Sequence, residues 1–423
     1  MTKRMPWLWL AAVVVLSAAT PAPAQFFIKD KDTVVIMGDS ITEQHLYSNY
    51  VEMWTVSRFP SYHLTFRNVG IGGDRSTGGN SRFARDVLAY KPTVLTIDFG
   101  MNDGSYRAFD DKIYQTYVKG LQGIADQARK AGIRVAWITP QPVERNEPGK
   151  QLDGYNLTLQ KFSDGPREIA KKNRGLFIDQ FHPYLAVIEK ARAGNDKIRI
   201  TGGDPVHPGP PGQALMAAAI LKGMKFPRFI SEAAITLDDK GLFKGSVEDN
   251  CVVTDIDIKN GVRFKRLDRS LPFFPPEARG ILKWAPVLDD MNYYGLQVKG
   301  LKPGRYEIRF AGNRIAEHSD KELAEGVNLA DAALTVGPVA DKVKQVWKAV
   351  QDKNRYFHDQ VFRGVVLAGH KSPIFKDREP GEIESVRREV YAERMRKMPE
   401  LDAAVRAALK VEPYVVEIVP AGK

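Results

Sequence analysis

An alternation of short apolar runs with amphipathic segments between residues 33 and 228 constrains the fold more than any other feature of this chain. Residues 114–128 carry apolar side chains at helical spacing, and Gly132 ends that helix. Further helices are expected at roughly 45–57, 80–90, 155–173 and 212–225. Strands separated by helices imply right-handed crossovers and a parallel sheet covered on both faces. The apolar runs predict five such strands, at Thr33–Met37, Leu64–Val69, Thr93–Phe99, Ile133–Thr139 and Leu176–Asp179.

The pattern changes after Phe229. Short alternating segments at Val252–Ile258, Tyr294–Val298 and Tyr306–Phe310 predict a small antiparallel β module within residues 231–311. Residues 338–365 and 380–410 predict two long helices, each with one apolar stripe for packing. The segment Tyr414–Val419 predicts a last strand that returns to the β module. We therefore expect a sheet domain over residues 25–229 and a C-terminal part over residues 230–423.

The first 24 residues have the composition of an export signal. Lys3 and Arg4 precede an apolar run from Trp7 to Ala19, and Ala22-Pro23-Ala24 supplies small residues for cleavage. This pattern predicts a Sec-type signal peptide and a secreted or periplasmic protein; the alternative is an uncleaved N-terminal anchor. No other apolar run approaches the length of a membrane span, so we expect no stable membrane span.

Composition excludes several classes of protein. A chain of 423 residues with 43% hydrophobic and 27% charged residues is neither disordered nor too short for large cores. The net charge of +11 comes from basic residues interleaved with acidic ones, and no nucleic-acid-binding motif is present, so we expect no nucleic-acid partner. The single cysteine, Cys251, and seven histidines without an HExxH spacing lead us to expect no metal and no other cofactor.

Four short polar segments stand at positions where chemistry is expected. In a parallel sheet, ligands bind beyond the carboxyl ends of the strands, and the first three segments directly follow predicted strands. Each segment alone is typical of an ordinary turn, whereas the ordered set is specific. The segments are Gly38-Asp39-Ser40, Asn68-Val69-Gly70-Ile71-Gly72-Gly73-Asp74, Gly100-Met101-Asn102-Asp103 and Asp204-Pro205-Val206-His207.

Together these segments contain the groups that acyl transfer requires. A serine hydroxyl, here Ser40, needs a base within hydrogen-bond reach, and His207 is the candidate. Asp204, three residues before it, can fix the tautomer of that imidazole. The oxyanion formed by attack on an ester needs donors, which the N–H groups of Ser40 and Gly73 and the amide of Asn102 can provide.

These four blocks resemble those of the GDSL or SGNH hydrolases, over about residues 33–225. The resemblance implies that Ser40 is the nucleophile, His207 the base and Asp204 its orienting partner, with Ser40, Gly73 and Asn102 as the oxyanion hole. It also implies a flavodoxin-like three-layer α/β/α sandwich with a five-stranded parallel sheet, here followed by the β module and long helices. No Gly-x-Ser-x-Gly elbow is present, so the α/β-hydrolase fold is not expected.

The substrate class is an analogy with members of that family. A secreted member with an accessory β module is similar to esterases that deacetylate carbohydrates, so an ester substrate such as an acetylated polysaccharide or oligosaccharide is expected. The alternatives are a lipid or phospholipid acylhydrolase and a non-catalytic polysaccharide-binding envelope protein. Packing is the expected role of residues 324–330 and 354–357, although they can instead reach over the crevice. His45 is expected on a helix face rather than as a second base.

Overall fold

The computed structural model describes residues 25–144, 152–195 and 197–422, so the predicted signal peptide at residues 1–24 lies outside the described residues. Five parallel strands form one sheet in the order β2-β1-β3-β4-β5. This is the flavodoxin-like order, and it confirms the predicted α/β class. The strands are β1 (Thr33–Gly38), β2 (Thr65–Asn68), β3 (Val94–Asp98), β4 (Arg134–Ile138) and β5 (Leu176–Ile178).

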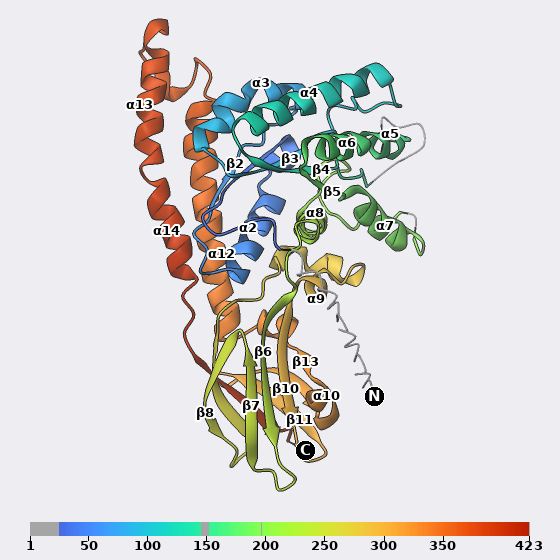
Figure 1. Cartoon of the computed structure of the whole chain (residues 1–423), viewed down its shortest axis with the longest axis vertical. Helices are drawn as coiled ribbons and strands as arrows, with labels where there is room; N and C mark the ends of the chain where they lie inside the picture. Colours follow the sequence, from blue (N-terminus) through green and yellow to red (C-terminus); the bar gives the residue numbers. More distant parts are fainter. Residues whose placement is uncertain (1–24, 145–151, 196, 423) are drawn as a thin grey trace, which may run out of the picture.

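Helices cover both faces of this sheet (Figure 1). Strand β1 is buried on both sides: Val34 and Ile36 belong to the core under α2 and α8, and Val35 and Met37 to the core under α3 and α4. Such alternation follows from the two-residue period of a strand. The helices of this domain are α1 (Ser40–Glu43), α2 (Leu46–Arg58), α3 (Ser76–Asp86), α4 (Asp111–Lys130), α5 (Tyr155–Phe162), α6 (Asp164–Asn173), α7 (Phe181–Arg192) and α8 (Pro210–Gly223), with a 3₁₀ turn at Leu88–Tyr90.

Two helical predictions for this domain need correction, and one helix was missed. The helix expected at 80–90 begins four residues earlier, at Ser76, whose N–H and hydroxyl both bond to Asp103. The helix expected at 155–173 is two helices, α5 and α6, which meet at Ser163. Helix α7 was not predicted, because its polar and apolar residues give only a weak helical stripe.

The β module is a sandwich of two sheets with the strand orders β13-β10-β6-β7 and β12-β11-β14-β9-β8. The prediction that it is antiparallel is wrong for one pair, since β6 and β10 run parallel. Strand β14 pairs with β9 and β11, as predicted for the last strand. The strands are β6 (Phe229–Leu237), β7 (Phe243–Asp249), β8 (Cys251–Asp257), β9 (Val262–Asp268), β10 (Tyr293–Lys299), β11 (Arg305–Phe310), β12 (Asn313–Ser319), β13 (Val327–Asn328) and β14 (Tyr414–Pro420).

Long helices lead from the sandwich back along the α/β domain (Figure 1). Helix α12 (Pro338–Tyr356) continues directly into a π-helix, η3 (Phe357–Val366), and the chain returns through α13 (Ile383–Met395) and α14 (Met398–Ala408). The helix predicted at 380–410 is therefore broken, and Pro399 stands in the first turn of α14, where proline is tolerated. Phe357, Phe362 and Met398 share one core with the sheet.

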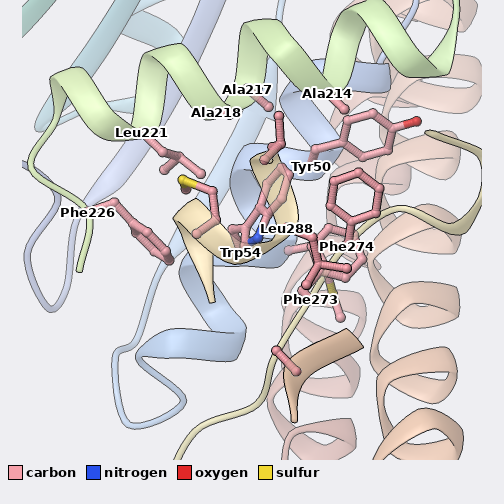
Figure 2. Packing of buried hydrophobic residues seen from close by; sticks show 14 of the residues in the cluster. Tyr50, Trp54, Ala214, Ala217, Ala218, Leu221, Phe226, Phe273, Phe274 and Leu288 are labelled. Carbon is pink, nitrogen blue, oxygen red and sulfur yellow. The ribbon is translucent and has the colours of Figure 1, made fainter. Parts of the chain in front are cut away.

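Short helices complete the architecture, and some of them pack between the α/β domain and the β module. Figure 2 shows Trp54 of α2 among Phe273, Phe274 and Leu288, below α8; its ring makes an edge contact of 5.2 Å with that of Phe273. Among the described residues, no helix is both long and apolar enough to cross a membrane. The short helices are 3₁₀ segments at Pro276–Lys283, Pro373–Phe375 and Pro380–Glu382, and α9 (Val287–Met291), α10 (Asp320–Glu325) and α11 (Ala330–Ala333).

A buried charge network fastens α12 to the α/β domain. Lys353 of α12 bonds to Glu52 of α2, and its Nζ lies 3.7 Å from Asp402 Oδ1 on α14. Arg67 of β2 bonds to the same aspartate at 2.7 Å. Asn354 donates to Glu52 at 2.7 Å. This contact holds the start of the segment 354–357 against α2, in agreement with the packing role expected of that segment. Because every partner is buried, each charge depends on its counter-ion.

Replacing Lys353 with methionine is expected to destabilise the fold by about 3–5 kcal/mol, because Glu52 is left buried without its cation. Urea unfolding of the purified variant measures this loss. The matched control is Lys348→Met on the same helix, since Lys348 forms an exposed pair with Asp352 that is worth at most about 0.5 kcal/mol. Equal stability of the two variants would contradict the network.

Candidate active site

Ser40 begins helix α1 directly beyond the carboxyl end of β1. The carboxylate of Asp39 caps this helix by accepting the N–H of Ile41 at 3.0 Å. Gly38 permits the sharp turn, since a Cβ there would lie 2.1 Å from Thr42 Oγ1 and 2.6 Å from the carbonyl of Asp98. The turn holds the Ser40 hydroxyl at the edge of the sheet where the other predicted segments also end.

The structure joins Ser40, His207 and Asp204 in one hydrogen-bonded chain. Ser40 Oγ lies 2.9 Å from His207 Nε2, and His207 Nδ1 lies 2.9 Å from Asp204 Oδ2. The other oxygen of Asp204 accepts the N–H groups of Val206 at 2.7 Å and His207 at 2.8 Å. Burial raises the pKa of Asp204, but these hydrogen bonds outweigh it and the pKa is lowered. An ionised Asp204 places the proton of the neutral ring on Nδ1 and leaves Nε2 free to accept the serine proton.

A second Asp-x-x-His segment shows that the motif alone does not make such a chain. His182 lies at the start of α7, with Nδ1 2.7 Å from Asp179 Oδ2 and its N–H bonded to Asp179 at 3.1 Å. Its local hydrogen bonds repeat those of His207, but no hydroxyl contacts its Nε2 among the described residues. What distinguishes His207 is therefore its position opposite the end of β1.

Gly73 lies in the loop after β2 with a φ of +73°, a conformation that favours glycine. No atom lies within 4 Å of the Cβ that another residue would place there, so this turn is open on one side. Arg82 of α3 fixes the loop from below: it bonds to Asp74 at 2.7 Å and to the carbonyl of Val69 at 2.7 Å. The same guanidinium reaches the carbonyl of Gly38 at 3.2 Å. Sequence reasoning missed this residue, which ties together the loops after β1 and β2.

Asn102 lies between these two loops. Its Nδ2 donates to the carbonyl of Asp74 at 3.0 Å and lies 3.3 Å from Asp39 Oδ2. The hydroxyl of Tyr106 donates to Oδ1 at 2.6 Å and so fixes which side of the amide carries the nitrogen. Ser105 and Tyr106 have φ values of +57° and +55°, and such strain in non-glycine residues concentrates at functional sites. Tyr106 was not predicted from sequence, because a lone tyrosine after a turn carries no signal.

Buried carboxyl groups lie beneath the site. Burial raises the pKa of Asp39 to about 7 and that of Asp103 to about 6, and it raises the pKa of Asp98 well above the usual range. Near neutral pH these groups therefore carry less negative charge than exposed carboxylates would, which weakens their repulsion of an anion above them. Among the described residues, no group of three or more His, Cys, Asp or Glu side chains is arranged to hold a metal ion.

His45 is the N-cap of α2 with a φ of +63°, and its two ring nitrogens are buried although the residue as a whole is only partly so. Its ring meets that of His358 edge-on, with 4.6 Å between centroids, and neither ring nitrogen has a hydrogen-bond partner among the described residues. Burial, with a smaller effect of His358, lowers its pKa from 6.5 to about 3. His45 is thus neutral at physiological pH, and packs between helices rather than bonding to Ser40.

The low pKa of His45 makes the fold sensitive to acid. Between pH 6.5 and about 3 the unfolded chain binds a proton at His45 that the folded chain does not. The free energy of unfolding then falls with falling pH, by at most about 1.4 kcal/mol per pH unit from this group. Urea unfolding at pH 7 and pH 5 is expected to show a smaller acid loss in His45→Phe than in the unsubstituted protein. An identical loss in both proteins would contradict this origin.

With the geometry described, comparison with known proteins gives the class. Residues 36–215, which contain every predicted site residue, match the GDSL-like Lipase/Acylhydrolase family. The α/β domain of this chain therefore carries the sequence of that family, the SGNH hydrolases, and the chemistry that this match supports is hydrolysis of ester bonds.

Individual relatives cover different parts of the chain. An acetylxylan esterase of Geobacillus stearothermophilus is 25% identical over 190 residues, which are 43% of this chain and 81% of that protein. The structure of BT4096, a gut microbial diltiazem-metabolizing enzyme, is similar over 94% of this chain and 99% of its own, with a TM-score of 0.77 and 22% identity. That likeness extends the shared fold to the sandwich and the C-terminal helices. The crystal structure of Axe2, the Geobacillus acetylxylan esterase, covers 48% of this chain and 97% of its own, with 20% identity and a TM-score of 0.41.

Proposed function

We propose that this protein is an exported serine esterase that removes acetyl groups from carbohydrates. The observation that carries the proposal is the continuous chain from Ser40 Oγ through His207 to Asp204, with both links at 2.9 Å. Carbohydrate as the substrate class is supported by the relationship to an acetylxylan esterase. Export is supported by the signal-like pattern of residues 1–24.

The first half of the reaction acylates Ser40. His207 Nε2 takes the hydroxyl proton while Oγ attacks the ester carbonyl, and the imidazolium that forms is stabilised by Asp204. The negative charge that develops on the carbonyl oxygen is stabilised by the N–H groups of Ser40 and Gly73 and by the Asn102 amide. The tetrahedral intermediate then expels the sugar oxygen, which receives the proton from His207.

The second half releases the acid. His207 removes a proton from water, the water attacks the acetyl–serine ester, and the intermediate expels Ser40 Oγ, which regains its proton. Acetate leaves and the starting state returns. The site suits a group presented by a large substrate, because the side chains of Asp204 and His207 are 58% and 36% exposed and Gly72 and Gly73 are exposed.

Substitution of Asn102 tests the oxyanion hole. Asn102→Ala is expected to lower kcat for p-nitrophenyl acetate by about 10²–10³, the usual effect of losing one donor of this kind. Tyr106→Phe removes only the hydroxyl that orients the amide, so a smaller loss, about tenfold, is expected. Steady-state kinetics of both variants give the comparison. An Asn102→Ala protein with unchanged kcat would remove this residue from the oxyanion hole.

A substrate panel tests the function itself. We expect acetate release from acetylated xylan or pectin and hydrolysis of p-nitrophenyl acetate well above that of long-chain p-nitrophenyl esters, with Ser40→Ala as the blank. Preference for long-chain esters or phospholipids would instead indicate an acylhydrolase of lipids. Binding of glycans without turnover of any ester would indicate a non-catalytic envelope protein. Periplasmic or extracellular recovery of the full-length chain in a bacterial host tests export.

A further inference from the structure

Residues far outside the family match reach the helix that carries Ser40. Glu43 is the last residue of α1, three positions after Ser40. Arg363 Nε donates to Glu43 Oε1 at 2.7 Å, and His358 Nε2 lies 3.8 Å from the same oxygen. Both side chains belong to the π-helix η3 in the C-terminal part. The C-terminal part therefore contacts the site, although not through the segments that the sequence suggested.

The π-helix explains why two residues five apart meet one carboxylate. Its hydrogen bonds join residue i to residue i+5, so His358 and Arg363 follow one another on nearly the same side. In an α-helix with 3.6 residues per turn, the same spacing would separate the two side chains by about 140°. Gly364 packs tightly against this turn, since a Cβ there would lie 2.4 Å from the carbonyl of Asp359. Rare π-helical segments occur frequently at functional sites.

Glu43 also contacts the loop that carries Gly73. Its carboxylate lies against Gly72, whose backbone N–H helps to lower the pKa of Glu43, and a Cβ on Gly72 would lie 3.0 Å from Glu43 Oε2 and 4.0 Å from the Cβ of Ser40. The side chain of Glu43 is only 14% exposed. The neighbouring His358 ring first, and then the Arg363 guanidinium, keep the pKa of Glu43 below its usual range in spite of burial.

A half-buried carboxylate in this place has two opposed effects on catalysis. It holds the Gly72-Gly73 turn, but its charge lies close to where the substrate oxygen becomes negative, and like charges in a poorly solvated site repel strongly. Arg363 of the π-helix, joined by His358 when that ring is protonated, offsets this charge. On the other side, the groups that face His358 are Asp359, whose Oδ1 lies 2.8 Å from Nδ1, and the neutral ring of His45.

We infer that Glu43, His358 and Arg363 are positioning residues of the oxyanion hole: Glu43 holds the Gly72-Gly73 turn, and Arg363, with His358 beside it on the C-terminal π-helix, offsets the charge of Glu43 as the oxyanion forms. This inference rests on the proposed ester hydrolysis. It gives the C-terminal helices a part in catalysis and makes the α/β domain alone an incomplete enzyme.

A double-mutant cycle with p-nitrophenyl acetate tests the network in the full chain. Arg363→Ala is expected to lower kcat about tenfold with KM within about twofold, because a transition-state interaction is weakened. Glu43→Gln keeps an acceptor for the Gly72 N–H and is expected to retain most of the activity. In Glu43→Gln/Arg363→Ala no carboxylate is left to neutralise, so kcat is expected to recover to that of Glu43→Gln. Arg363→Lys keeps the charge and is expected to stay close to the unsubstituted protein.

Controls separate catalysis from folding. Arg363 is 58% exposed, so its removal is tolerated by the fold, and thermal unfolding of each variant checks this. Arg355→Ala, an exposed arginine two turns earlier in the same long helix, is expected to leave kcat unchanged. An unchanged kcat in Arg363→Ala, or a double variant as slow as Arg363→Ala, would overturn the inference while leaving the proposed function intact. An unsubstituted protein that hydrolyses no ester would overturn both.

Discussion

Replacing Ser40 with alanine is expected to lower kcat for p-nitrophenyl acetate by about 10⁶, which brings the rate to the detection limit of the assay, without changing the fold. The reason is that the hydroxyl 2.9 Å from His207 Nε2 is the atom that takes the acyl group in the proposed reaction. Initial rates over a range of substrate concentrations, together with a thermal unfolding curve, measure both parts of this expectation.

Ser81→Ala is the matched control for that experiment. Ser81 is exposed on α3, and within the part of the chain that the structure describes its hydroxyl bonds only to the carbonyl of Gly78 in the same helix. Its removal is expected to leave kcat unchanged. A Ser40→Ala protein that retains a tenth or more of the activity would show that another group is the nucleophile.

Replacing His207 with alanine is expected to cost nearly as much, again about 10⁶ in kcat. Without the imidazole, the Ser40 hydroxyl keeps its proton and remains a poor nucleophile. Because the two residues act as a unit, the double variant Ser40→Ala/His207→Ala is expected to be no slower than either single one. Asp204→Ala is expected to lose less, about 10⁴, since the base remains and only its orientation and charge balance suffer.

The chain supplies an unusually close control for this second experiment. His182 makes the same two local contacts to Asp179 that His207 makes to Asp204. His182→Ala is therefore expected to leave kcat unchanged while removing an equivalent local structure. If His182→Ala and His207→Ala lost activity equally, the loss would come from loop stability and not from a general base.

The positions of the candidate site residues were predictable from sequence because parallel strands bring their carboxyl ends to one edge of the sheet. Once β1, β2 and β3 are assigned to one parallel sheet, their carboxyl ends must lie together, and Ser40, Gly73 and Asn102 follow with them. Local turn chemistry then identifies the Asp204 to His207 loop. The fold of the α/β domain was predictable for the same reason, since its strands are continuous buried runs that periodicity detects.

The features that were not predicted depend on contacts between residues far apart in the sequence, or on details that the hydrophobic pattern does not distinguish. Arg363 is 320 residues from Glu43 in the chain, so the sequence around either residue does not indicate that the two form an ion pair. A strand alternates with the same period whether its neighbour is parallel or antiparallel, which is why the parallel β6–β10 pair was missed. The π-helix at Phe357–Val366 likewise has an apolar face that suits an α-helix equally well.

Covalent labelling tests the central claim most directly, because it asks which hydroxyl is activated and does not depend on the natural substrate. The protein is treated with a fluorophosphonate, digested and analysed by mass spectrometry. We predict a single phosphonylated residue, Ser40, with loss of esterase activity in proportion to labelling and no label in His207→Ala. Complete loss of activity with the label on a different residue, or undiminished activity after Ser40 is fully labelled, would contradict the account.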